Sequence, residues 1–485
     1  MALSDRWGMP ARARTSLWSR LLSAAAVVAL GIVIGAQYMA PDKRMLAVAA
    51  AVVLAGLAWR VDTLTGLGFL ILAIPYPRGT VFGSTNLAFV LLLLILWLLR
   101  VTQRRSPLPA STPVDGAIAG LVLAYAVSFY NVTDALSLNY ALQNAELFLA
   151  TVFLFYMVVS NVRTADDLRR LQTFQVISLV TIGLLAIFEL NHPGGAFIPG
   201  WIEFTATQGT EFGTKNVRVG GPFFDFELLS EFSAISSLLL AFLILRARSV
   251  AQRAILSGIL LLDLFMLFAT VTRGAIIALS LGLLYLLFRI RRRLRVVPLT
   301  LAVASIAALA GLMNFYVAHF TRSGDVGARL RETRFIGVVP DSRLGAWTSG
   351  WQRYLEHPLI GHGPYYSPQT GTHTWFWPHN VYLYIANIVG AVGLAFFLIL
   401  LIRMFQLSSR GSDDLMDPDY ARAFLLIANV QLVVFAIDQV KIDYLRNPVY
   451  QFEVWLMFAM LISAYRITHP APGPAAAAEP EPAAA

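Results

Sequence analysis

The tripeptide Pro378-His379-Asn380 opens a long apolar run, an unusual place for a titratable side chain. Pro378 is typical of the first turn of a helix, so His379 is predicted at the positive end of an apolar helix. That field disfavours imidazolium, and a neutral imidazole can take a proton from a hydroxyl group. We therefore predict that His379 is a general base and that Asn380 holds its ring or a bound molecule. Alternatively, the pair only caps the helix.

Three arginines stand at predicted ends of apolar runs. Arg218 precedes one run, Arg273 lies in VTRGA between two others, and Arg343 lies in a short amphipathic helix predicted over 341–358. A charge at the membrane boundary is costly unless it is paired or hydrated, so these residues are candidates for a functional site. Alternatively, Arg273 reaches out of the membrane beside a turn and Arg343 contacts lipid headgroups.

Acidic residues gather near Arg218. Asp225, Glu227 and Glu231 stand at the predicted start of an apolar run, with Glu227 and Glu231 on one helical face. They are candidates for binding a cation or the acceptor, meaning the molecule whose hydroxyl proton His379 would take. Acids also stabilise a helix N-terminus by themselves. Arg218 has the simpler alternative of neutralising Asp225 or Glu227. Asp263 lies inside a predicted span and is expected to pair internally or to line a polar cavity.

The segment before His379 is rich in aromatic residues and glycine. Arg343 and Trp347 share one face of the predicted helix, and Trp347 is a candidate for stacking on a sugar ring or for anchoring at lipid headgroups. Gly361 and Gly363 in PLIGHGPYY allow the backbone to approach a ligand closely. We therefore include these residues among the candidates for substrate binding.

Composition indicates a polytopic membrane protein. The chain has 485 residues, of which 57% are hydrophobic and 13% charged, and its mean hydropathy is +0.66. The basic residues are spread between apolar runs, which argues against a nucleic-acid partner. Because the chain has no cysteine, disulfides, thiolate metal sites and cysteine nucleophiles are excluded.

Hydropathy predicts an all-α, polytopic integral membrane protein with about 12–14 transmembrane helices. Residues 1–468 form one transmembrane domain, with short interfacial helices in a large extracytoplasmic loop, and 469–485 form a disordered Pro/Ala-rich tail. The first span is expected to be a retained anchor, and the second and third are short enough for a re-entrant hairpin. The predicted spans are 18–39, 46–59, 61–75, 85–99, 114–132, 141–161, 171–190, 227–245, 254–271, 274–289, 296–318, 380–402, 421–438 and 449–466.

The distribution of lysine and arginine predicts the orientation. Basic residues concentrate in alternate short connections, so both termini are expected in the cytoplasm. The long loops 191–226 and 319–379 then face outward, and the polar candidates lie at the extracytoplasmic side. A bacterial inner membrane is the expected location.

Several of these motifs together resemble the bacterial O-antigen ligase and O-antigen polymerase superfamily. The resemblance covers residues 215–400. Its motifs are Arg343-x-x-x-Trp347, HPLIGHG at 357–363, and His379-Asn380 followed after nine residues by Gly390-x-x-Gly393. RVGGPFFDFELLSEF at 218–232 and VTRGA at 271–275 are similar to further family elements, but FDFELLSE carries acids where the family often has neutral residues.

The resemblance implies a glycosyltransferase that acts outside the cytoplasm. The donor would be a glycan on a polyprenyl (undecaprenyl) diphosphate carrier, and the acceptor a hydroxyl group of a glycolipid or saccharide. His379 would activate the acceptor, Arg273 and Arg343 would grip the diphosphate, and Arg218 would assist, so that one displacement inverts the anomeric centre. The nine-residue spacing favours a ligase, while a polymerase of lipid-linked repeats, or a polysaccharide transporter or lipid flippase, remains an alternative.

No metal or other cofactor is expected. The adjacent acid pairs, Asp166-Asp167 and Asp413-Asp414, fall on the predicted cytoplasmic side. His357, His362 and His373 lack the spacing of a zinc site. The residues therefore predict metal-independent transfer.

Overall fold

The computed structural model describes most of the chain as helices. The described residues are 61–76, 85–192, 196–198, 202–203, 207–208, 217–291, 296–321, 324–331, 335–336, 339–364 and 378–470. The predicted spans 18–39 and 46–59, and the predicted tail beyond residue 470, lie outside them. Three hairpins of two or three residues per strand are the described β-structure.

The element bounds follow the predicted spans closely. Each predicted span that lies within the described residues coincides with a helix. The α-helices are α3 (Thr63–Ala73), α4 (Thr85–Thr102), α5 (Asp115–Ser128), α6 (Ala135–Asn161), α7 (Ala165–Asn191), α8 (Phe226–Leu245), α9 (Val250–Ala269), α10 (Arg273–Ile290), α11 (Val296–Phe320), α12 (Val326–Arg331), α13 (Asp341–Tyr354), α14 (Val381–Ser408), α15 (Tyr420–Asp438) and α16 (Pro448–Thr468). The strands are β1 (Ala196–Ile198), β2 (Ile202–Glu203), β3 (Thr207–Gln208), β4 (Val217–Arg218), β5 (Phe335–Ile336) and β6 (Val339–Pro340), and the 3₁₀ turns are η1 (Phe129–Asn131), η3 (Gly221–Phe223) and η4 (Tyr444–Arg446).

Seven of the described helices are long and apolar enough to cross a membrane, by length and composition: α6, α7, α8, α9, α10, α14 and α15. Shorter apolar helices occupy Thr63–Ala73, Asn86–Thr102 and Ala307–Phe320. The predicted all-α, multi-pass membrane fold is therefore confirmed. The full number of crossings stays a prediction.

Polar residues define where the apolar helices begin. The Asp225 side chain accepts the backbone N–H groups of Glu227 and Leu228 at the start of α8. Asn447 accepts two N–H groups at the start of α16, where Pro448 occupies the first helical position. These caps satisfy backbone donors that lipid cannot satisfy, so each helix has a defined first residue.

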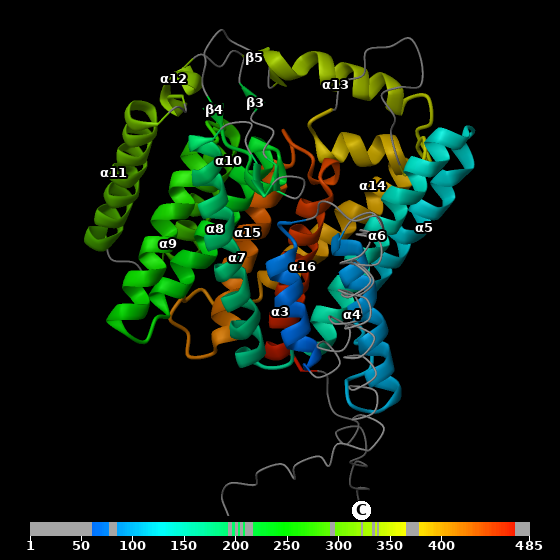
Figure 1. Ribbon diagram of the computed structural model, residues 1–485, viewed down its shortest axis with the longest axis horizontal. Coiled ribbons are helices and arrows are strands. Elements are labelled where there is room, and N and C mark those ends of the chain that lie inside the picture. Colours follow the sequence, from blue (N-terminus) through cyan, green and yellow to red (C-terminus); the bar gives the residue numbers. More distant parts are fainter. Residues whose placement is uncertain are drawn as a thin grey trace, which may run out of the picture.

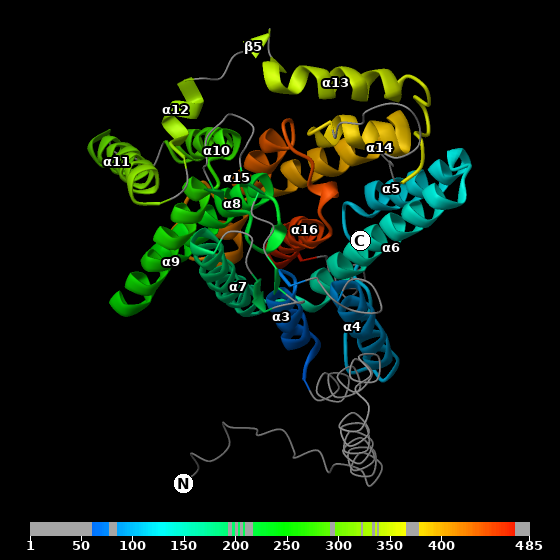
Figure 2. The ribbon, with the colours of Figure 1, turned by 45° about the horizontal axis from the view of Figure 1, so that its top comes forward.

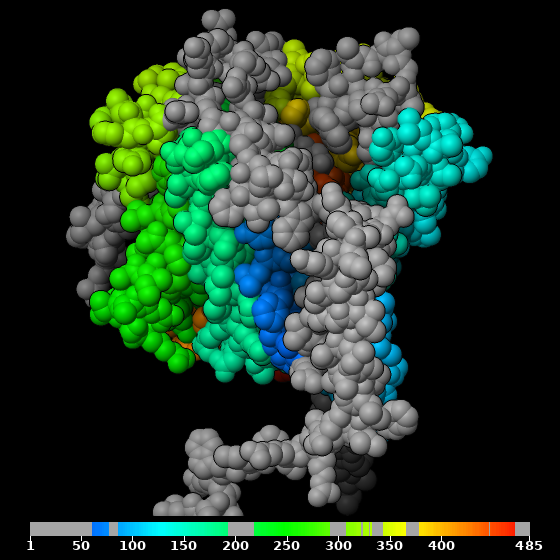
Figure 3. Space-filling view, in the orientation of Figure 1, coloured from blue at the N-terminus to red at the C-terminus, as the bar shows by residue number. Residues whose placement is uncertain are grey.

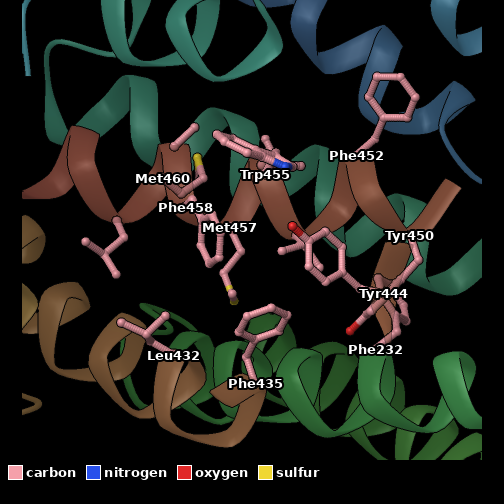
Figure 4. Packing of buried hydrophobic residues seen from close by; sticks show 14 of the residues in the cluster. Phe232, Leu432, Phe435, Tyr444, Tyr450, Phe452, Trp455, Met457, Phe458 and Met460 are labelled. Carbon is pink, nitrogen blue, oxygen red and sulfur yellow. The ribbon is translucent and has the colours of Figure 1, made fainter. Parts of the chain in front are cut away.

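Aromatic side chains fill the centre of the bundle. Figure 4 shows Phe458 of α16 pointing toward Phe435 of α15, whereas Trp455 lies on the other side of α16, where it contacts Phe148 and Phe155 of α6. The ring centroids of Phe435 and Phe458 lie 5.5 Å apart and those of Trp455 and Phe458 lie 5.9 Å apart, both edge to face. Van der Waals packing of this kind is a main attraction between helices in lipid, because lipid tails solvate an apolar side chain as well as another side chain does.

Helix α13 lies across one end of the bundle. Figures 1 and 2 both show it over α14, against which it packs. We call this end the α13 face: α8, α10 and α14 begin there, and α7, α9 and α15 end there. On the side shown in Figure 3, α7 lies between α3 and α9. The α13 face therefore collects the connections that carry the candidate residues.

Candidate functional site

His379 lies immediately before α14 rather than inside its first turn. Asn380 is the N-cap, and its side-chain oxygen accepts the N–H of Leu383 at 3.0 Å. The expected position of Pro378 in the first turn is wrong, because the cap lies two residues after the proline. His379 has a φ of +46°, and the N–H of Val381 contacts the carbonyls of Gln439 and Ile442 at 3.0 and 3.1 Å. The α15–α16 connection thus fixes the backbone at His379.

Glu227 brings His379 and Arg343 together. The Arg343 guanidinium donates to Oε1 of Glu227, and Nδ1 of His379 lies 3.5 Å from Oε2 of the same carboxylate. Both contacts are largely shielded, since 12% of the Glu227 side chain, 19% of Arg343 and 28% of His379 are exposed. Three elements distant in sequence therefore meet at one carboxylate.

Arg218 is buried against the turn that carries Arg273. Its guanidinium donates to the carbonyl of Thr270 at 2.9 Å and to the hydroxyl of Thr272 at 3.1 Å. It also lies 3.2 Å from the centre of the Phe226 ring. Arg273 is the first residue of α10, directly after this turn. Arg218 thus holds the start of α10 in place.

Lys441 is a cation of the α13 face that sequence reasoning missed. Its Nζ lies 2.8 Å from Oδ1 of Asp438, which is fully buried. A Cβ on Gly274 would lie 1.5 Å from Cε of Lys441, so the glycine after Arg273 makes room for the lysine. In the sequence, the feature that points to this contact is Gly274. A glycine by itself does not show that it packs against Lys441, which lies 167 positions later (441 minus 274).

Glu227 and Glu231 of α8, and Asp263 of α9, have different surroundings. Glu231 is fully buried, one turn below Glu227, and both its oxygens accept from Nε2 of Gln439 at 2.8 Å. It therefore supports the α15–α16 connection. Asp263 of α9 is also fully buried and lies beside the Ser233 hydroxyl of α8.

Helix α14 is broken at Gly390, and the preceding loop repairs the break. Gly390 has φ +70° and ψ −174°, a conformation open essentially to glycine. The carbonyls of Asn387 and Ile388 accept the N–H groups of His362 and Gly363 at 2.8 and 3.0 Å. On the other side of the break, the N–H groups of residues 391 and 392 donate to the carbonyls of residues 358 and 359 at 2.8 and 3.3 Å. The loop thus satisfies backbone groups that membrane interiors do not leave unpaired.

Gly361 and Gly363 make this insertion possible. Both have positive φ, +72° and +114°. A Cβ on Gly361 would lie 2.4 Å from the carbonyl of Ile388, and one on Gly363 would lie 2.4 Å from Val132. The close backbone approach predicted for these glycines is therefore made to the protein itself. His379-Asn380 therefore stands directly before the helix whose break at Gly390 is hydrogen-bonded to the 357–363 segment.

Gly390→Ala is expected to destabilise the folded protein by about 1–3 kcal/mol, because alanine is strained in the backbone conformation that Gly390 adopts. Its Cβ would also lie 2.1 Å from the carbonyl oxygen of Leu359. Thermal unfolding of the purified protein in detergent measures the loss. Gly258→Ala is the matched control, since a Cβ there meets nothing within 4 Å. Equal unfolding temperatures for the two variants would contradict the proposed role of the break.

Trp347 lies within α13, and His362 contacts its last turn. The indole Nε1 of Trp347 is buried without a hydrogen-bond partner among the described side chains and backbone groups. Nε2 of His362 lies 2.9 Å from the carbonyl of Arg353, to which it donates. Burial lowers the pKa of His362, which agrees with a neutral ring in this contact. The described residues hold no group of three or more His, Cys, Asp or Glu side chains that could bind a metal ion.

Part of the chain matches a known protein family. Residues 258–398 match the sequence model of the O-antigen ligase family, which confirms the resemblance seen in the motifs. The match includes Arg273, Arg343 and the His379-Asn380 pair, whereas Arg218 and Glu227 precede it. No curated protein matches the chain.

Proposed function

Because residues 258–398 match the O-antigen ligase family model, we propose that this multi-pass membrane protein transfers a glycan from a polyprenyl diphosphate carrier to a hydroxyl acceptor. The observation that carries the proposal is the meeting of His379 and Arg343 at Glu227. An imidazole and a guanidinium in one cluster provide a proton acceptor and a phosphate ligand. Transfer between a diphosphate donor and a hydroxyl acceptor needs both.

The reaction is a single displacement. The acceptor oxygen attacks the anomeric carbon, the bond from that carbon to the phosphate oxygen breaks, and the configuration inverts. His379 takes the hydroxyl proton, which supplies about 10²–10⁴-fold. The polyprenyl diphosphate leaves with the bonding electrons, and Arg273 and Arg343 stabilise its negative charge. Activation comes from the donor, so neither a nucleotide nor a metal ion is required.

The remaining candidates arrange these groups. Arg218 acts through the turn that begins α10, and Asn380 caps α14 beneath His379. Trp347 offers a ring face and a buried N–H to a sugar near Arg343. The 357–363 segment, with Gly361 and Gly363, holds the broken helix. The α13 face is then the extracytoplasmic side of a bacterial inner membrane, with both termini in the cytoplasm.

Ligase and polymerase differ in the acceptor. The nine residues between Asn380 and Gly390 favour a ligase, which passes the glycan to lipid A core or another acceptor. A polymerase passes it to another carrier-linked repeat. The experiment supplies purified protein with a labelled lipid-linked repeat, with and without a separate glycolipid acceptor. A product that needs the glycolipid supports the ligase, and a ladder from the donor alone supports the polymerase. If both mixtures return unchanged donor, the proposed transfer is wrong.

A further inference from the structure

We propose that Glu227 is a positioning residue for transfer: its carboxylate holds His379 by Nδ1 and Arg343 by its guanidinium, so that base and phosphate ligand keep one fixed relation. This rests on the proposed function. Glu227 lies before the residues that match the family, and the acid stands where the resemblance expects a neutral side chain. The support for this role is the geometry of this chain, not the family match.

The contacts divide the two carboxylate oxygens between the two partners. Oε1 accepts from Arg343, and Oε2 faces Nδ1 of His379 at 3.5 Å. A histidine whose Nδ1–H faces a carboxylate has Nε2 as its basic nitrogen. The acceptor hydroxyl then meets Nε2, and the positive charge that the ring gains lies beside a negative one.

The backbone of Glu227 is well placed to define this relation. It lies in the first turn of α8, where the Asp225 side chain accepts its N–H at 2.8 Å. The neighbouring Phe226 contacts Arg218 through its ring and Thr272 through its carbonyl. The same helix end is thus tied to the turn before Arg273. One short segment of α8 connects all the groups proposed to act on the donor and acceptor.

Burial makes the contacts costly to lose. With 12% of its side chain exposed, an ionised Glu227 depends on its partners, because a shielded charge without one is strongly unfavourable. Glu231 is no substitute, since its oxygens are taken by Gln439. Replacing Glu227 therefore releases His379 and Arg343 together, while the rest of α8 keeps its own cap.

The test measures transfer kinetics of the full-length protein with a labelled polyprenyl diphosphate glycan. Glu227→Gln is expected to lower kcat about 10–100-fold, the range seen when a carboxylate that orients a histidine is removed at metal sites. Glu227→Asp keeps the charge and is expected to restore part of the rate. The matched control is Glu356→Gln, an acid on the same face with 62% of its side chain exposed, which should retain the wild-type rate. A wild-type kcat in Glu227→Gln would overturn the proposal.

A double-mutant cycle separates positioning from a merely structural role. In a His379→Ala background, Glu227→Gln should cause a smaller loss than in the wild type, because the His379 contact is already gone and only the Arg343 contact remains to be lost. Additive losses would assign Glu227 to stability alone. ¹⁵N-histidine spectra give a second readout, in which the Nδ1–H signal that disappears in His379→Ala should also change in Glu227→Gln. If His379→Ala abolishes transfer but Glu227→Gln changes neither rate nor spectrum, the proposed function stands and the positioning role fails.

Discussion

His379→Ala is expected to lose about 10²–10⁴-fold in glycan transfer, the usual contribution of a general base. The fold should survive, because His379 precedes the cap of α14 and 28% of its side chain is exposed. Asn380 continues to cap the helix, and the contacts of the Val381 N–H are made by the backbone. The loss should therefore appear in kcat, with an unchanged thermal unfolding temperature.

The measurement uses purified protein in liposomes that contain the labelled donor. His319→Ala is the matched control, since His319 is an exposed histidine at the end of α11, and its Nδ1 contacts the carbonyl of Phe315 in its own helix. The same liposomes report movement of the lipid carrier between leaflets. Lost transfer with unchanged carrier flux excludes the transporter alternative. Full transfer by His379→Ala would remove His379 from the mechanism.

The helices were predictable because lipid leaves the backbone few choices. Every apolar run within the described residues became a helix, since a helix satisfies its N–H and C=O groups internally. Hydropathy does not predict the break in α14, although Gly390 and Gly393 belong to one of the motifs. Apolar residues continue on both sides of Gly390, and hydropathy does not register that residues 358–363 replace the missing hydrogen bonds. Pro378 was misplaced for a similar reason, because Asn380 competes with it to define the helix start.

The candidate site was predicted in its residue types but not in its connections. Histidine and arginine at helix ends indicated the chemistry, and the structure places His379 and Arg343 on Glu227. Contacts between residues more than a hundred positions apart leave no periodic signal. Lys441 is not recognisable as a site residue in the sequence. Its partner Asp438 is a single acid at the end of an apolar helix, and the lysine packs against Gly274, which has no side chain. Arg218 appeared as a phosphate ligand, whereas the structure binds its guanidinium to the α9–α10 turn.

Arg343→Ala is expected to lower kcat by about 10²–10³-fold, which corresponds to the 2.7–4 kcal/mol typical of one preorganised charge stabiliser. The guanidinium is held by Glu227 and can present further N–H groups to a diphosphate. Arg343→Lys keeps the charge but not the planar fork, so it should recover only part of the rate. Kinetics with the labelled donor compare the three proteins.

The matched control for Arg343 is Arg353→Ala, which removes the same charge from the last turn of α13. If α13 acts only as a cationic helix at the membrane surface, the two alanine variants should be impaired equally, and the loss should shrink in liposomes without anionic lipid. If Arg343 binds the departing diphosphate, its loss should be far larger than that of Arg353→Ala and independent of the lipid charge. We expect the second result, because Glu227 holds the Arg343 guanidinium in the same cluster as His379. If α13 were only a cationic helix, the position of an arginine along it would not matter.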